Sequence, residues 1–178
     1  ILGPQEIRNA LYQGQASMFL LKMSQSAEFR KATDYSIKPD RMLDREFCLR
    51  FVCFTQLDVE KEYTVLDEFL NKGMEYLSVA DDYTLSQVYF EFEYVMKVSN
   101  ELFGKFAFRR LNTEERRGPV NKSLFEAWSL IILGLSDNDI NILKHQKDIL
   151  RKNSLHCVMI TIFKIPFAHP TKHLLNRE

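Results

Sequence analysis

Two charged residues in an otherwise apolar stretch are the most unusual chemical feature of this sequence. Arg50 lies between Leu49 and Phe51 in the segment 41–54, whose apolar residues recur at helical spacing. Glu46 precedes Arg50 by four residues, so both side chains share one helix face in the favourable acid-first order. A buried guanidinium is costly unless it is paired, so we predict an internal Glu46–Arg50 ion pair. The alternative is an arginine whose stem covers the core and whose charge reaches solvent.

This interpretation carries a prediction about stability. Removing Glu46 would strand a buried cation, whereas removing Arg50 would leave an acid that can be neutralised by a proton. We therefore expect Arg50→Met to be tolerated better than Glu46→Ala.

A basic segment further along the chain has the composition of a nucleic-acid contact. Its cations are Lys105, Arg109, Arg110, Arg116 and Arg117. Phe106 and Phe108 are interleaved with them, and phosphate contact with base stacking uses this combination of side chains. The alternative is a solvated loop whose cations pair with Glu114 and Glu115, because small basic clusters are common on neutral proteins. DNA is therefore one candidate partner.

Cysteine and histidine offer weak candidates for metal or nucleophile chemistry. Two of each could on paper form a zinc set: Cys48, Cys53, His169 and His173. The two pairs are far apart in the chain, and residues five apart on a helix point in different directions, so buried core cysteines are the favoured interpretation. Cys157 with His145 or His156 has no nucleophile signature. With no glycine-rich phosphate loop either, the sequence predicts no catalytic residue, metal ligand or cofactor in this chain.

The elements that must position these residues are predicted to be helices. The chain has 178 residues, of which 46% are apolar and 12% aromatic, with only 6 glycines and 5 prolines. This composition favours packed helices over a turn-rich β fold. The 24 basic residues balance the 24 acidic ones, so no global field attracts DNA or an anionic membrane. No apolar run reaches the ~18 residues that a membrane span needs, and no membrane partner is expected.

Compartment and chain context follow from two smaller observations. Three cysteines without a secretory signal favour a reducing, cytoplasmic setting. The chain begins with Ile1 rather than methionine, which suggests a piece of a longer protein.

Helical periodicity is clearest in the segment 83–104, where apolar residues keep three-four spacing over five turns. Asp81 or Asp82 is its expected N-cap and Gly104 its stop. A short helix is predicted for Gln5–Tyr12, with Ile7 and Leu11 on one face. Further helices are expected at 16–24, 65–76, 122–135 and 136–152.

The resulting fold prediction is an all-α, multi-helix orthogonal or bundle domain with about seven to eight helices. It spans residues 1–165 and packs around 41–54 and 83–104. Residues 155–165 could be a strand or a core helix, and a helix is favoured. The tail 166–178 is expected to be loop or disordered.

The order of several short phrases resembles a known family. The phrases are Pro4-Gln-Glu-Ile-Arg-Asn-Ala-Leu-Tyr12 followed by Gly14, then Arg41-Met42, Glu46, Leu49-Arg50-Phe51, Phe69-Leu-Asn71 with Met74, Asn121-Lys122 and Leu124-Phe125-Glu126. Over roughly residues 4–150 the series resembles the helical region behind the N-terminal domain of the GmrSD-type restriction endonucleases, the family labelled domain of unknown function 262.

The resemblance implies a setting rather than a catalytic role. In that family an N-terminal ParB/sulfiredoxin-like core with an Asp-Gly-Gln-Gln-Arg motif handles nucleotide, and a metal-dependent nuclease often accompanies it. The sequence contains neither the Asp-Gly-Gln-Gln-Arg motif nor a recognisable nuclease motif. The resemblance thus implies a non-catalytic helical part of a nucleotide-dependent DNA restriction, or phage-defence, protein. Its partners would be the missing nucleotide-binding and nuclease domains, and any nucleotide or divalent metal would belong to those domains.

Within the resemblance, four residues of the first helix fit inter-domain contact: Gln5, Glu6, Arg8 and Asn9. The alternative function is a protein–protein interaction module with no DNA role.

Overall fold

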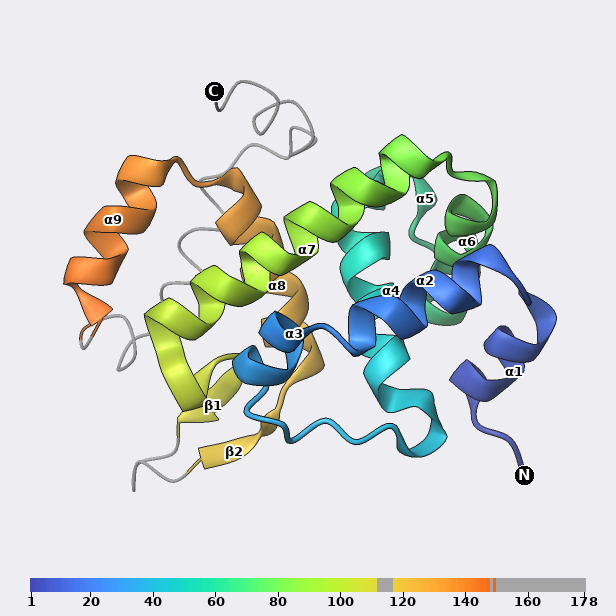
Figure 1. Cartoon of the computed structure of the whole chain (residues 1–178), viewed down its shortest axis with the longest axis horizontal. Coiled ribbons are helices and arrows are strands. Elements are labelled where there is room, and N and C mark those ends of the chain that lie inside the picture. The colour runs from blue at the N-terminus through green and yellow to red at the C-terminus, as the bar shows by residue number, and fades with distance from the viewer. Residues whose placement is uncertain (112–116, 148, 150–178) are drawn as a thin grey trace.

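Residues 1–111, 117–147 and 149 are described by a computed structural model of the chain (Figure 1). The α-helices in this part are α1 (Pro4–Leu11), α2 (Gln15–Ser24), α3 (Ala27–Ala32), α4 (Leu43–Gln56), α5 (Val59–Glu62), α6 (Leu66–Val79), α7 (Asp82–Phe103), α8 (Lys122–Gly134) and α9 (Asp137–His145). Two 3₁₀-helices are η1 (Asp40–Met42) and η2 (Gly104–Phe106), and a small antiparallel sheet pairs β1 (Arg109–Leu111) with β2 (Arg117–Val120). The all-α, multi-helix prediction is confirmed.

Helix α7 is the longest described element and crosses the molecule diagonally (Figure 1). Asp81 caps it by accepting a hydrogen bond from the Thr84 backbone N–H at 2.8 Å. Gly104 ends it with a φ of 55°, a conformation that glycine adopts without steric cost. Both predicted boundaries of this helix are therefore confirmed.

Helix α4 lies at the centre of the core, because every residue from Phe47 to Cys53 is buried. It packs against α2, α6 and α8, and Phe51 contacts Phe92 of α7 edge-on at 5.1 Å between ring centroids. The prediction that 41–54 and 83–104 organise the fold is thus consistent with the packing. The helix begins later than expected, since Arg41 and Met42 have φ of 51° and 57° and separate η1 from α4.

A glycine allows α6 to approach α4 closely. A Cβ atom placed on Gly73 would lie 2.2 Å from Cys53 Sγ and 3.0 Å from Leu49 Cδ1, well inside normal contact distance. The helices can therefore pack at this separation only because residue 73 has no side chain.

The segment 105–120 shows no regular periodicity in the sequence and is predicted to be irregular, but the structure contradicts this for the described part. Residues on either side of 112–116 pair as β1 and β2, with Arg109 opposite Val120. The hairpin is held because Phe108 is buried against Phe125, with ring centroids 4.9 Å apart, and Arg109 is buried beside it. The sequence does not predict the burial of Phe108 and Arg109, because the segment that contains them is rich in charged residues.

Some predictions fall outside the described residues: the helix or strand at 155–165, the tail 166–178, and the roles of Arg116, His156, Cys157, His169 and His173. Among the helices that are described, none combines the length and the apolar character needed to cross a lipid bilayer.

Candidate interaction surfaces

A cluster of four charges around the buried Arg50 joins α4 to α8. Arg50 donates from Nε to Glu46 Oε1 at 2.9 Å and from Nη1 to Glu126 Oε1 at 2.5 Å. Lys122 donates to the same Glu46 oxygen at 2.8 Å. The Arg50 side chain is only 9% exposed, and the two acids are 18% and 14% exposed. The predicted Glu46–Arg50 ion pair is therefore present, and Glu126 and Lys122 enlarge it.

Burial and pairing act in opposite directions on these acids. Burial opposes ionisation of Glu46, but hydrogen bonds from Lys122 and Arg50 outweigh it and hold the pKa of Glu46 below its usual range. Burial dominates at Glu126 and raises its pKa, even though Arg50 favours the charged form. Each carboxylate is engaged by a cation, so the cluster serves as a structural clamp rather than a free acid–base pair.

Helix α1 presents its polar side to the protein. Gln5 and Arg8 are 2% and 5% exposed. Arg8 donates from Nε to Asn71 Oδ1 at 3.1 Å, donates from Nη1 to Gln5 Oε1 at 3.3 Å, and forms an ion pair with Asp67. Tyr12 extends the contact by donating to Glu75 at 3.2 Å. The polar face of α1 is thus bound along α6.

The inter-domain role of Gln5, Glu6, Arg8 and Asn9 stays a prediction, although in this structure all four have contacts within the chain. Glu6 Oε2 accepts from the Gly3 backbone N–H at 2.5 Å, and Asn9 Oδ1 accepts from Arg45 at 3.1 Å. These side chains thus have partners within the chain, with Gln5 and Arg8 buried and Glu6 and Asn9 half-buried.

The outward face of α1 is apolar instead. Ile7 is 45% exposed and Leu11 is 74% exposed, whereas Gln5 and Arg8 are buried. Leu2 and Met18, from the segments flanking α1, are also exposed, at 61% and 65%. A surface helix of a globular protein normally has the reverse orientation. Sequence periodicity revealed the two faces of this helix, but it carried no signal to show which face points to solvent.

The predicted basic segment is divided between the core and the surface. Arg109 is 5% exposed and donates to the backbone oxygens of Gly118 and Thr33, at 2.6 and 3.0 Å, and to Ser36 Oγ at 2.6 Å. It therefore cannot act as a surface nucleic-acid contact, and Phe108 is likewise buried. Burial also lowers the pKa of Arg109.

The other described cations of this segment remain on the surface. Arg110 and Lys105 are exposed, and Lys105 Nζ lies 5.3 Å from the Phe106 ring centre. Arg117 is exposed and pairs with Asp34. Arg109 brings this hairpin against α3 and the turn that follows it, which adds surface residues that the sequence did not connect: Arg30, Lys31, Tyr35 and Lys38.

Metal binding has no assembled site in the described ranges. No group of three or more His, Cys, Asp or Glu side chains gathers there in a way that could hold a metal ion. Cys48 and Cys53 are fully buried free thiols, and burial raises the pKa of both. They act as core residues, as predicted.

The fold and its surfaces define the class of this protein as an all-α, multi-helix domain. No protein-family model, curated protein or solved structure matches the chain. The resemblance to the helical region of the GmrSD-type endonucleases gains no support from these comparisons and stays a prediction.

Proposed function

We propose that this chain is a non-catalytic docking domain, which binds a partner protein through the apolar face of α1. The observation that supports the proposal is the inverted orientation of α1, with Ile7 and Leu11 in solvent and Arg8 buried. Exposed apolar area of this kind costs free energy in water, and a partner would recover that free energy by covering it.

The resemblance to the GmrSD-type restriction endonucleases suggests which protein would be the partner. In a restriction protein of the GmrSD type, the apolar face of α1 would contact the nucleotide-handling domain, and nucleotide and divalent metal would be bound there and in the nuclease rather than in this chain. Such a system acts on foreign DNA, and three cysteines without a secretory signal favour a cytoplasmic setting. A protein–protein interaction module without a DNA role would use the same face.

The border of the α1 face constrains the chemistry of the partner. Asp67 and Glu75 lie on α6 along the edge of α1, where they contact Arg8 and Tyr12. Asp67 keeps 75% of its side chain exposed despite its ion pair. The partner is therefore expected to present an apolar ridge with basic residues on the side that meets α6.

The test measures binding of the chain to the nucleotide-handling domain encoded at the same locus, by isothermal titration calorimetry. Ile7→Asp places a charge in the centre of the face and should weaken binding at least tenfold, or about 1.4 kcal/mol. Ile142→Asp on α9 is the matched control, because Ile142 is 47% exposed against 45% for Ile7.

Three results would count against the proposal. Equal affinities for wild type, Ile7→Asp and Ile142→Asp would refute docking through α1. Self-association that is lost in Ile7→Asp, seen by analytical ultracentrifugation, would replace the partner domain with a second copy of the chain. A locus without an Asp-Gly-Gln-Gln-Arg domain would remove the restriction setting while leaving α1 as a docking face to be tested with other partners.

A further inference from the structure

The part of the molecule that holds β1, β2 and α3 lies away from α1 and is assembled from segments distant in sequence (Figure 1). Arg109 of β1 donates to Thr33 O and Ser36 Oγ, which follow α3, and to Gly118 O of β2. Arg117 of β2 pairs with Asp34 in the same turn. These contacts fasten the hairpin to α3 and the turn 33–36. The outer side chains of the hairpin, of η2 before it, of α3 and of the segment 33–38 form one surface, which we call the hairpin end.

The hairpin end is rich in exposed cations. They are Arg30, Lys31, Lys38, Lys105, Arg110 and Arg117. Two acidic side chains of these segments, Glu28 and Asp34, are occupied by Lys31 and Arg117 respectively. Within the described residues, no ion pair engages the remaining four: Arg30, Lys38, Lys105 and Arg110. Four cations thus remain available for phosphate groups.

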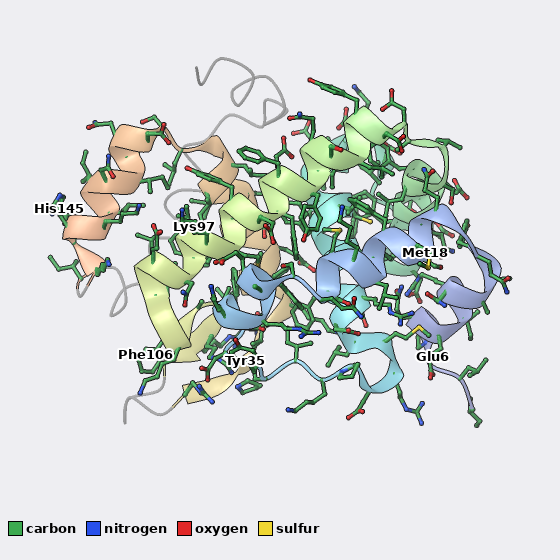
Figure 2. The ribbon with its side chains drawn as sticks, viewed as in Figure 1. Glu6, Met18, Tyr35, Lys97, Phe106 and His145 are labelled. Atoms are coloured by element: carbon green, nitrogen blue, oxygen red, sulfur yellow. The ribbon has the colours of Figure 1, made fainter. Side chains whose placement is uncertain are left out.

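An exposed aromatic ring accompanies the cations. Tyr35 is 63% exposed, and its φ of 53° places a tyrosine in the left-handed region that non-glycine residues seldom adopt. Tyr35 and Phe106 lie at the same end of the molecule in Figure 2, and Phe106 is partly exposed. The Tyr35 N–H is bonded to Arg30 O at 2.8 Å, which ties the backbone of this tyrosine to α3.

From this arrangement we propose that the hairpin end binds single-stranded nucleic acid, with Arg30, Lys38, Lys105 and Arg110 on phosphates and Tyr35 stacked on a base. A ring on a surface turn can stack only on bases that are already unstacked, which favours a single strand over a duplex. This site is distinct from the face in the proposed docking function and does not depend on it.

The distribution of charge along the chain supports binding of a polyanion at the hairpin end. Residues 58–82, which include α5, α6 and the start of α7, hold eight acidic and two basic side chains. These elements lie on the far side of the molecule from the hairpin (Figure 1). A polyanion is therefore repelled from one end and drawn toward the other, although the chain is neutral as a whole.

The experiment measures binding of a fluorescein-labelled oligothymidylate of about 20 nucleotides to the full chain by fluorescence anisotropy. Four phosphate contacts predict a slope of log affinity against log salt of about −3, because each contributes about 0.7 on a single strand. Affinity should then fall about 50-fold between 50 and 200 mM salt. A labelled duplex of the same length should bind more weakly than the single strand.

Two pairs of variants locate the site. Tyr35→Asn removes the ring and should weaken binding about fivefold or more, and asparagine tolerates the left-handed backbone, so the fold should be retained. Tyr83→Asn is its matched control, because Tyr83 is 62% exposed near the acidic end. Arg110→Glu should weaken binding and reduce the salt slope by about one, whereas Lys61→Glu, at the acidic end, should change the slope little.

The outcomes decide the proposal. Undetectable binding at 50 mM salt, a flat salt dependence, or equal losses in Tyr35→Asn and Tyr83→Asn would overturn it. Tighter binding of the duplex, or of vesicles containing phosphatidylglycerol, would also overturn it in favour of a general anion surface. Ile7→Asp should leave oligonucleotide binding unchanged, so failure of the α1 docking function and failure of this site are separable.

Discussion

Substituting single residues of the charge cluster around Arg50 gives the sharpest test of how the core is stabilised. The structure reverses the order expected from sequence, because Arg50 has two acidic partners rather than one. Glu46→Ala leaves Arg50 paired with Glu126 and leaves Lys122, whose side chain is 40% exposed, able to reach solvent. Arg50→Met leaves Glu126, whose side chain is 14% exposed, without the cation that pairs with it. We now predict that Arg50→Met destabilises the protein more than Glu46→Ala does.

The magnitudes follow from how much charge each variant leaves uncompensated. Breaking a buried pair by removing one partner costs about 3–5 kcal/mol, and the partial exposure here favours the lower end, about 3 kcal/mol for Arg50→Met. Glu46→Ala removes one of two partners from Arg50, which costs about 1 kcal/mol. For a chain of this size, the Tm should fall by about 6–12 °C and 2–4 °C respectively.

The pH dependence provides a second signature of the same cause. Burial already raises the pKa of Glu126, and loss of Arg50 should raise it further. A carboxyl with a raised folded pKa takes up its proton more readily in the native state, so stability is regained as pH falls through that pKa. The Tm deficit of Arg50→Met should therefore shrink between pH 8 and pH 5. A second substitution, Glu126→Gln, in the Arg50→Met background should restore part of the Tm at pH 8.

Differential scanning fluorimetry at several pH values, checked by urea unfolding, measures all three variants. Equal Tm values for Arg50→Met and Glu46→Ala would show that the cluster is solvated, contrary to its low exposure. A deficit in Arg50→Met that is independent of pH would show that lost packing of the arginine stem, rather than a stranded carboxylate, causes the destabilisation.

Two further predictions concern close packing and a buried acid. Gly73→Ala should lower the free energy of unfolding by about 1–2 kcal/mol in urea titrations, because its Cβ would overlap Cys53 Sγ, and a Cys53→Ala background should cancel most of the loss. Additive losses in the double variant would contradict this account. Burial raises the pKa of Glu91, which is 4% exposed and accepts from Gln56 Nε2 at 2.7 Å. Wild type should therefore lose stability as pH rises through the folded pKa, so Glu91→Gln should melt about 2–4 °C higher at pH 8 with a smaller gain at pH 5. A gain that does not depend on pH would exclude a charged Glu91 as the cause.

The sequence predicts the helical core well because apolar periodicity reports directly on burial. The long helix between Asp81 and Gly104 and the acid–arginine spacing at Glu46 and Arg50 are local patterns, and the structure has both. Glu126 lies eighty positions after Glu46, and no local spacing could bring it into the cluster.

The features that the sequence did not predict share one physical origin. In each case, hydrogen bonds to partners distant in the sequence bury a charged or polar side chain. Arg109 is predicted at the surface by its charge, yet its guanidinium donates in the interior to Thr33 O, Ser36 Oγ and Gly118 O. Arg8 is buried in the same way by Asn71 and Asp67 of α6. Periodicity assigns a face to each helix, but only tertiary hydrogen bonds decide whether a polar face points inward.

The inverted orientation of α1 follows from the same argument. Rotating the helix to bury Ile7 and Leu11 would carry Arg8 away from Asn71 and Asp67, whose contacts with Arg8 hold the helix to α6. The apolar gain from burying two aliphatic side chains, about 1.5–3 kcal/mol each at most, would be offset by polar groups left unpaired at about 1–3 kcal/mol each. The isolated chain therefore gains little by hiding this face, whereas a partner that covers it leaves every polar contact of Arg8 intact. This asymmetry is the physical reason to expect α1 to function in contact with another protein.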